Sequence, residues 1–135
     1  MTDAGLAPGR AEMLLDSRVV INLATGLDED AERVLVAFLV GTAAQTAGKQ
    51  VAMFLTKDAV KLGLEDHAQG RACKNCPELG DLFAQFVAAG GVLFVCPICF
   101  AARDLNKDEL VSSARLEGAT PLWQWIGDDA TVFSY

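Results

Sequence analysis

The sequence has too little positive charge for a protein that binds nucleic acid. Eleven Lys and Arg residues stand against 18 Asp and Glu residues, which gives a net charge of −7 in a chain of 135 residues. A surface that neutralises phosphate groups needs the opposite balance. We therefore expect no nucleic-acid partner.

Long hydrophobic runs are missing as well. The most apolar stretch, residues 34–40 (VLVAFLV), is far shorter than the roughly 20 residues that cross a bilayer. A secretory signal needs a basic start and an unbroken apolar run, but residues 1–17 carry three acidic residues, Asp3, Glu12 and Asp16. These absences predict a cytoplasmic protein without a membrane partner.

Motifs that bind nucleotide phosphates are also absent. The sequence contains neither Gly-x-Gly-x-x-Gly nor a Walker-type loop. It therefore gives no indication of a nucleotide-binding site. Histidine occurs once, as His67, in the same stretch as Cys73. His67 is a candidate metal ligand or proton acceptor for a thiol, although a solvated loop histidine is the interpretation that we favour.

What the sequence does contain is enough apolar material for a core. Hydrophobic residues make up 52% and charged residues 21%, which is typical of a folded domain. We expect a flexible arm over residues 1–17 and one domain over residues 18–135. Apolar runs and amphipathic stretches alternate along that domain. The expected strands are 18–23, 50–56, 92–95, 114–119 and 130–135, and the expected helices are 28–47, 58–64, 78–89, 98–105 and 121–126.

Strands that alternate with helices predict an α/β fold. We expect a single-domain three-layer α/β/α sandwich with a mostly parallel five-stranded sheet. In such sheets ligands and chemistry gather beyond the carboxyl ends of the strands. The segment 65–77 has no apolar periodicity and is predicted to be a long loop at that edge.

The first long helix is apolar almost all round. One set of residues at a spacing of three and four predicts a core-facing stripe: Ala31, Val34, Leu35, Phe38, Leu39 and Thr42. Outside this stripe lie Val36, Ala37 and Val40, which would form a contiguous apolar strip in water. The pattern predicts a homo-oligomer, with a dimer as the commonest physical solution.

Trp123 and Trp125 lie two residues apart on the last expected helix. Residues at this spacing do not share a helix face. We therefore expect one indole to pack in the core and the other to be left for a partner or pocket.

The four cysteines form two pairs with the spacing of a zinc site. Cys73-Lys-Asn-Cys76 and Cys96-Pro-Ile-Cys99 are separated by 19 residues, within the range for tetrahedral zinc ligands. The intervening helix and strand return the chain to the same sheet edge. The spacing leaves open whether the four sulfurs bind zinc or only face one another.

Cys96 is the candidate nucleophile. It follows a predicted buried strand and precedes a helix whose first turn holds Pro97, and a thiolate is favoured beside a helix amino-terminus. Cys99, one turn on, is placed to resolve a disulfide or persulfide formed on Cys96. Positive charge near the thiols is expected from three supporting residues, Arg71, Lys74 and Arg103.

The pattern resembles the DsrE/DsrF-like family of small sulfur-relay proteins, which includes the TusD-type subunits. The resemblance runs from Val19 to Tyr135 through VVINLATG, VAMFLTKDAVKLG, the helix ending in AAGG, VLFVCPICFAARDL and the closing VFSY. It implies an α/β/α sandwich assembled into trimers or hexamers. It also implies a persulfide carrier at the position of Cys96. The relay subunits usually need only one cysteine, so the resemblance does not explain Cys73, Cys76 or Cys99.

Three functional hypotheses follow. In the leading one, Cys96 carries a persulfide between sulfur donor and acceptor proteins or small thiols, as a sulfurtransferase or sulfur carrier that requires no cofactor. The second is a structural or regulatory zinc module with four ligands, Cys73, Cys76, Cys96 and Cys99. The third is a dithiol redox switch in which each pair forms a disulfide.

Overall fold

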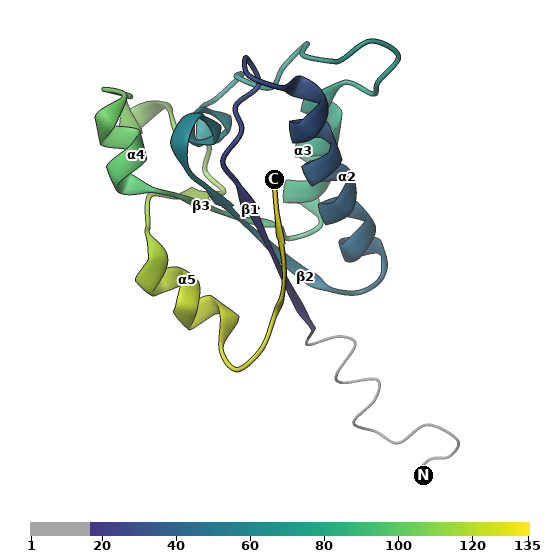
Figure 1. Cartoon of the computed structure of the whole chain (residues 1–135), viewed down its shortest axis with the longest axis vertical. Coiled ribbons are helices and arrows are strands. Elements are labelled where there is room, and N and C mark those ends of the chain that lie inside the picture. The colour runs from purple at the N-terminus through teal and green to yellow at the C-terminus, as the bar shows by residue number, and fades with distance from the viewer. Residues whose placement is uncertain (1–16) are drawn as a thin grey trace.

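A computed structural model describes residues 17–135 and has one five-stranded sheet (Figure 1). The arm expected over residues 1–17 therefore lies outside the described residues, Ser17 excepted. The strands are β1 (Arg18–Leu23), β2 (Gln50–Leu55), β3 (Val92–Val95), β4 (Ala114–Arg115) and β5 (Thr131–Ser134). The α-helices are α2 (Ala31–Thr46), α3 (Leu79–Ala88), α4 (Pro97–Ala102) and α5 (Ala119–Ile126), and the 3₁₀ helices are η1 (Lys57–Gly63) and η2 (Lys107–Glu109).

All strand pairs are parallel, and the strand order is β4-β3-β2-β1-β5. β2 lies at the centre between β3 and β1, and both β1 and β2 are largely apolar runs that are suited to burial on both faces. Because β1, β2 and β3 all run the same way, their carboxyl ends meet at one edge. The predicted α/β fold is confirmed.

Alternate side chains of the central strands enter two separate cores. Val19, Ile21 and Leu23 of β1 point to the larger core under α2 and α3, whereas Val20 points to a smaller core with Leu122 of α5. Figure 1 shows α2 and α3 together on one face of the sheet and α5 on the other. The three layers of the prediction are present in residues 17–135.

The face of α2 that packs on the sheet differs from the predicted stripe. Ala37 is fully buried, although we expected it to lie outside the core, and Leu39 is 41% exposed, although we expected it inside. Gly41 is buried too, and a Cβ there would lie 3.2 Å from Ile21 Cδ1. The helix approaches the sheet through small residues, which turns the contact face toward Ala37 and Gly41 and leaves Val36 and Leu39 in solvent.

Three further elements differ from the prediction in helix type or in length. The segment after β2 is a 3₁₀ helix, α4 ends at Ala102 instead of residue 105, and β4 has two residues instead of six. The Asp104 backbone, with φ 53°, leaves the helical region, which is why α4 stops early. β4 pairs only with Leu93 and Phe94 of β3.

The two tryptophans divide as predicted. Trp123 is 69% exposed, whereas Trp125 packs against the smaller core. Arg18 fixes Trp125, because its guanidinium lies 5.5 Å from the ring centroid and donates to the Trp125 carbonyl at 2.6 Å. Within residues 17–135, no helix combines the length and apolar character that crossing a bilayer requires.

Candidate functional site

Cys96 lies at the carboxyl edge of the sheet, between β3 and α4. Its amide donates to the Leu55 carbonyl at the end of β2, at 3.0 Å, and its own carbonyl accepts from the Phe100 amide, also at 3.0 Å. Pro97 occupies the first helical position, where a missing N–H costs nothing. The backbone of Cys96 is therefore held by both the sheet and the helix, and its thiol is free and half-buried.

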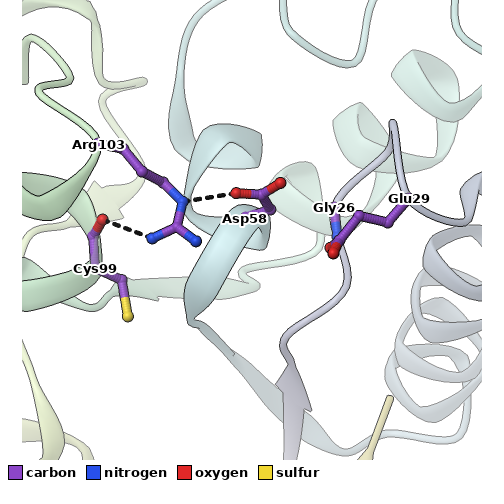
Figure 2. A network of polar contacts seen from close by, with 5 residues as sticks. All are labelled: Gly26, Glu29, Asp58, Cys99 and Arg103. Atoms are coloured by element: carbon purple, nitrogen blue, oxygen red, sulfur yellow. Dashed lines mark hydrogen bonds and ion pairs between the residues drawn. The ribbon is translucent and has the colours of Figure 1, made fainter.

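Cys99 is the second free thiol of this edge and is tied to the neighbouring η1 through Arg103. The Arg103 guanidinium donates to the Cys99 carbonyl at 3.1 Å and, through Nε, to the Asp58 carboxylate at 2.6 Å. Figure 2 shows the guanidinium between these two partners, with the Cys99 sulfur directed away from the carboxylate. The hydrogen bond from Arg103 lowers the pKa of Asp58, so this carboxylate stays ionised.

Asp58 also packs against the loop that follows β1. A Cβ placed on Gly26 would lie 2.7 Å from Asp58 Cβ, so only glycine allows this approach. The Gly26 amide donates to the Glu29 carboxylate at 2.8 Å, which fixes the loop beside Asp58 (Figure 2). Lys57 turns the chain from β2 into η1 with φ 51° and thereby brings Asp58 to this position.

Cys73 and Cys76 are joined by a disulfide in the loop between η1 and α3. Their Cα atoms are 5.1 Å apart, and Asn75 between them has φ 63°, as a tight turn requires. The base of the loop is closed by the Leu79 amide, which donates to the Arg71 carbonyl at 2.8 Å. The predicted long loop is therefore an ordered turn with a covalent crosslink.

Arg71 connects this loop to the segment after β1. Its guanidinium donates to the Asp28 carboxylate at 2.6 Å and thereby lowers the pKa of Asp28. His67 is half-buried, not fully solvated as we expected. Burial lowers its pKa, the charge of Arg71 adds to this effect, and the charge of Asp28 opposes it.

Two of the three predicted supporting charges have aspartate partners. Arg71 and Arg103 are each neutralised by an aspartate, and Lys74 is exposed in the disulfide loop. Arg103 does touch Cys99, but through the backbone carbonyl. Sequence reasoning missed Asp58, whose ion pair with Arg103 spans 45 residues and leaves no local signal.

The four cysteines form two separate pairs. Cys73 and Cys76 are disulfide-bonded, whereas Cys96 and Cys99 are free. Within residues 17–135, which contain all four, no group of three or more His, Cys, Asp or Glu side chains is arranged to hold a metal ion. This arrangement does not provide the tetrahedral site that their spacing allowed.

Comparisons with known proteins place this geometry in a family. The chain resembles the crystal structure of the YchN protein from E. coli, with a TM-score of 0.71, 16% identity, and coverage of 89% of this chain and 99% of that one. It also resembles MTH1491 from Methanobacterium thermoautotrophicum, a protein of unknown function, with a TM-score of 0.67, 14% identity, and coverage of 89% and 100%. A search of curated proteins gives no match.

At these identities the structural likenesses establish the fold alone, and membership rests on the sequence. The family model of the DsrE/DsrF-like proteins matches residues 18–135, which is the whole α/β domain. The resemblance seen in the sequence is thereby confirmed over residues 18–135. The chain belongs to the DsrE/DsrF-like family.

Proposed function

We propose that Cys96 carries a sulfane sulfur as a persulfide, received from a donor protein or small thiol and passed to a partner. The observation that carries this proposal is the free, half-buried thiol of Cys96 at the carboxyl edge of a parallel sheet. The family resemblance implies a sulfur carrier at the same position. The thiol is accessible enough to react and is held by a rigid backbone.

The transfer step is a thiol exchange. The Cys96 thiolate attacks the outer sulfur of a donor persulfide, R–S–SH, so that Cys96–S–SH forms and the donor leaves as RS⁻. In the second transfer, a partner thiolate attacks the outer sulfur of Cys96–S–SH. The partner then carries the persulfide, and the Cys96 thiolate leaves. No oxidant or reductant is consumed, because the sulfane sulfur only changes its carrier.

Intact mass tests the carrier directly. The reduced protein is incubated with a persulfide donor, and we expect a mass gain of one sulfur atom that disappears in Cys96→Ser. If neither wild type nor Cys99→Ser gains sulfur, or if Cys96→Ser gains it to the same extent, the proposal is wrong. Peptide mapping assigns the modified residue.

A zinc module is the competing proposal, and it rests on the 19-residue spacing of the two pairs. Zinc binding would require the Cys73–Cys76 disulfide to be reduced and the disulfide loop to approach α4. Elemental analysis of protein purified under reducing conditions separates the proposals. About one zinc per chain that is lost in Cys73→Ser supports the module, whereas metal-free protein with four titratable thiols rejects it.

The disulfide itself favours a third candidate function, a dithiol switch. The Cys73–Cys76 crosslink lies in a loop whose Arg71 binds Asp28, so its reduction would loosen a contact to the segment after β1. Limited proteolysis of oxidised and reduced protein tests this role. We expect cleavage near Lys74 only after reduction, and identical cleavage in both states would reject the switch.

We also propose that the protein forms a homo-oligomer, as a trimer or hexamer by family resemblance. Val36 and Leu39 of α2 are 38% and 41% exposed, and Phe133 of β5 is 42% exposed. Phe133 pairs in register with Ile21, whose side chain points to the α2 face, so the three side chains share one side of the sheet. An exposed apolar surface beside an open strand edge is suited to association with another copy.

A further inference from the structure

A second thiol lies in the same helical turn as the proposed carrier. Cys96 is the N-cap residue of α4 and Cys99 is its third residue. Residues three positions apart are neighbours on a helix surface, about one turn from each other. The sulfur that Cys96 would carry is therefore within about one helical turn of the only other free thiol among residues 17–135.

Another pair of cysteines with the same spacing already forms a disulfide in this chain. Cys73 and Cys76 are also three residues apart, and they form a disulfide with Cα atoms 5.1 Å from one another. Disulfides accept Cα separations of about 4.4–6.8 Å, a range that one helical turn also meets. The Cys96–Cys99 pair therefore has the chain separation that a disulfide needs.

Cys99 is held in place more firmly than a surface residue of a short helix would be. Arg103 binds its carbonyl and is itself anchored to Asp58, which packs on Gly26. Cys96 is anchored independently through the Leu55 carbonyl. Two reacting groups on fixed backbones react as if at high concentration, because little positional entropy is lost when they meet.

We propose that Cys99 is a resolving thiol that releases the sulfur from Cys96 as sulfide. The Cys99 thiolate attacks Cys96 Sγ, the bond between Cys96 Sγ and the outer sulfur breaks, and HS⁻ leaves. The balance is Cys96–S–SH plus Cys99–SH giving Cys96–S–S–Cys99 plus H₂S. The sulfane sulfur is reduced and the two thiols are oxidised, so no further oxidant is needed.

This inference rests on the proposed function, because it needs the persulfide on Cys96. It makes the pair a sulfane-sulfur reductase site, not only a relay. Each turnover leaves a disulfide, so the reaction that follows must be its reduction by a thiol. A partner thiol receives the sulfur only if it attacks before Cys99 does.

The experiment compares four forms of the full chain. Wild type, Cys99→Ser, Cys99→Ala and the matched double variant Cys73→Ser/Cys76→Ser are loaded with sodium polysulfide and desalted without added thiol. Intact mass and released sulfide are then followed with time. The double variant removes the other pair of identical spacing, and circular dichroism confirms that each form is folded.

We expect wild type and the double variant to release sulfide and to lose the two thiol hydrogens of the Cys96–Cys99 pair. Both Cys99 variants should keep the extra sulfur at least about tenfold longer, because the neighbouring nucleophile is gone. Equal persulfide lifetimes in wild type and the Cys99 variants would overturn the resolving role and leave the carrier intact. If the Cys99 variants gain no sulfur, the carrier proposal fails instead.

Discussion

Arg103 Nε lies 2.6 Å from the Asp58 carboxylate and joins α4 to η1 at the edge where both free thiols lie. Asp58→Asn keeps the size of the side chain but removes its charge. We expect a small loss of unfolding free energy, because both side chains are partly solvated. The alkylation rate of Cys99 should change severalfold, because Arg103 would no longer be held against the Cys99 carbonyl by Asp58. Asp104→Asn, exposed on the same segment, is the control and should leave the alkylation rate unchanged.

Gly26 tests how closely the β1 loop approaches η1. The Cβ of Gly26→Ala would lie 2.7 Å from Asp58 Cβ, so one of the two backbones must shift. We expect a loss of about 1–3 kcal/mol in urea unfolding, as for other overpacked sites. Gly118→Ala is the matched control, because its Cβ would lie at an ordinary 3.6 Å from Pro97 Cδ. Equal stability of the two variants would contradict the close approach.

The Cys73–Cys76 crosslink closes a very short stretch of chain, with a sequence separation of 3. The entropy that it removes from the unfolded state is correspondingly small, so Cys76→Ser should lower the unfolding free energy by about 2 kcal/mol or less. Chemical denaturation with and without reductant measures this. Reductant should have no such effect on the variant, and a much larger loss in wild type would show that the loop supports the core.

His67 makes stability depend on pH in a defined direction. Burial lowers its pKa below the ordinary value of 6.5, so the unfolded chain takes up the proton first as the pH falls. The stability from neutral His67 is complete above the unfolded pKa and decreases as the pH falls from there through the folded pKa. Urea midpoints between about pH 7.5 and about pH 5.5 should fall in wild type and stay flatter in His67→Gln. Parallel curves would contradict the assignment.

Assembly should depend on the exposed face of α2. Val36→Asp combined with Leu39→Asp places charge in the apolar surface without touching the core, because both side chains are more than a third exposed, at 38% and 41%. We expect light scattering to show an oligomer in wild type and a monomer in the double variant. Ala84→Asp, exposed on α3, is the control for added charge. A wild-type monomer at micromolar concentration would contradict the proposal.

The sequence predicts the strands well where burial is continuous. Arg18–Leu23 is found with the expected bounds, because a β-branched run buried on both faces has no competing helical period. The face of α2 that contacts the sheet could not be predicted. Ala37 and Gly41 are buried because their small size lets the helix approach the sheet closely, and hydrophobicity does not reveal this. The spacing of apolar residues alone predicted that Leu39 faces the core and that Ala37 does not.

The site was predictable only in part. The positions of Cys96 and Cys99 follow from a strand that ends before a helix, which is a local pattern. The partners of Arg71 and Arg103 are 43 and 45 residues away, so only the folded chain brings them together. The spacing of the two cysteine pairs fits zinc and disulfides equally well, and the structure has a disulfide between Cys73 and Cys76 with Asn75 in the turn between them.

The brevity of β4 bears on how firmly the border of the sheet next to β3 is held. β3 is bordered on one side by four paired positions of β2 and on the other by only two residues of β4. Opening of the 111–118 segment therefore breaks few backbone hydrogen bonds, and such local unfolding requires much less free energy than global unfolding. Amides of this segment should exchange with solvent well before those of β1. The β4 border, beside the strand that leads into Cys96, is thus expected to open while the centre of the sheet stays closed.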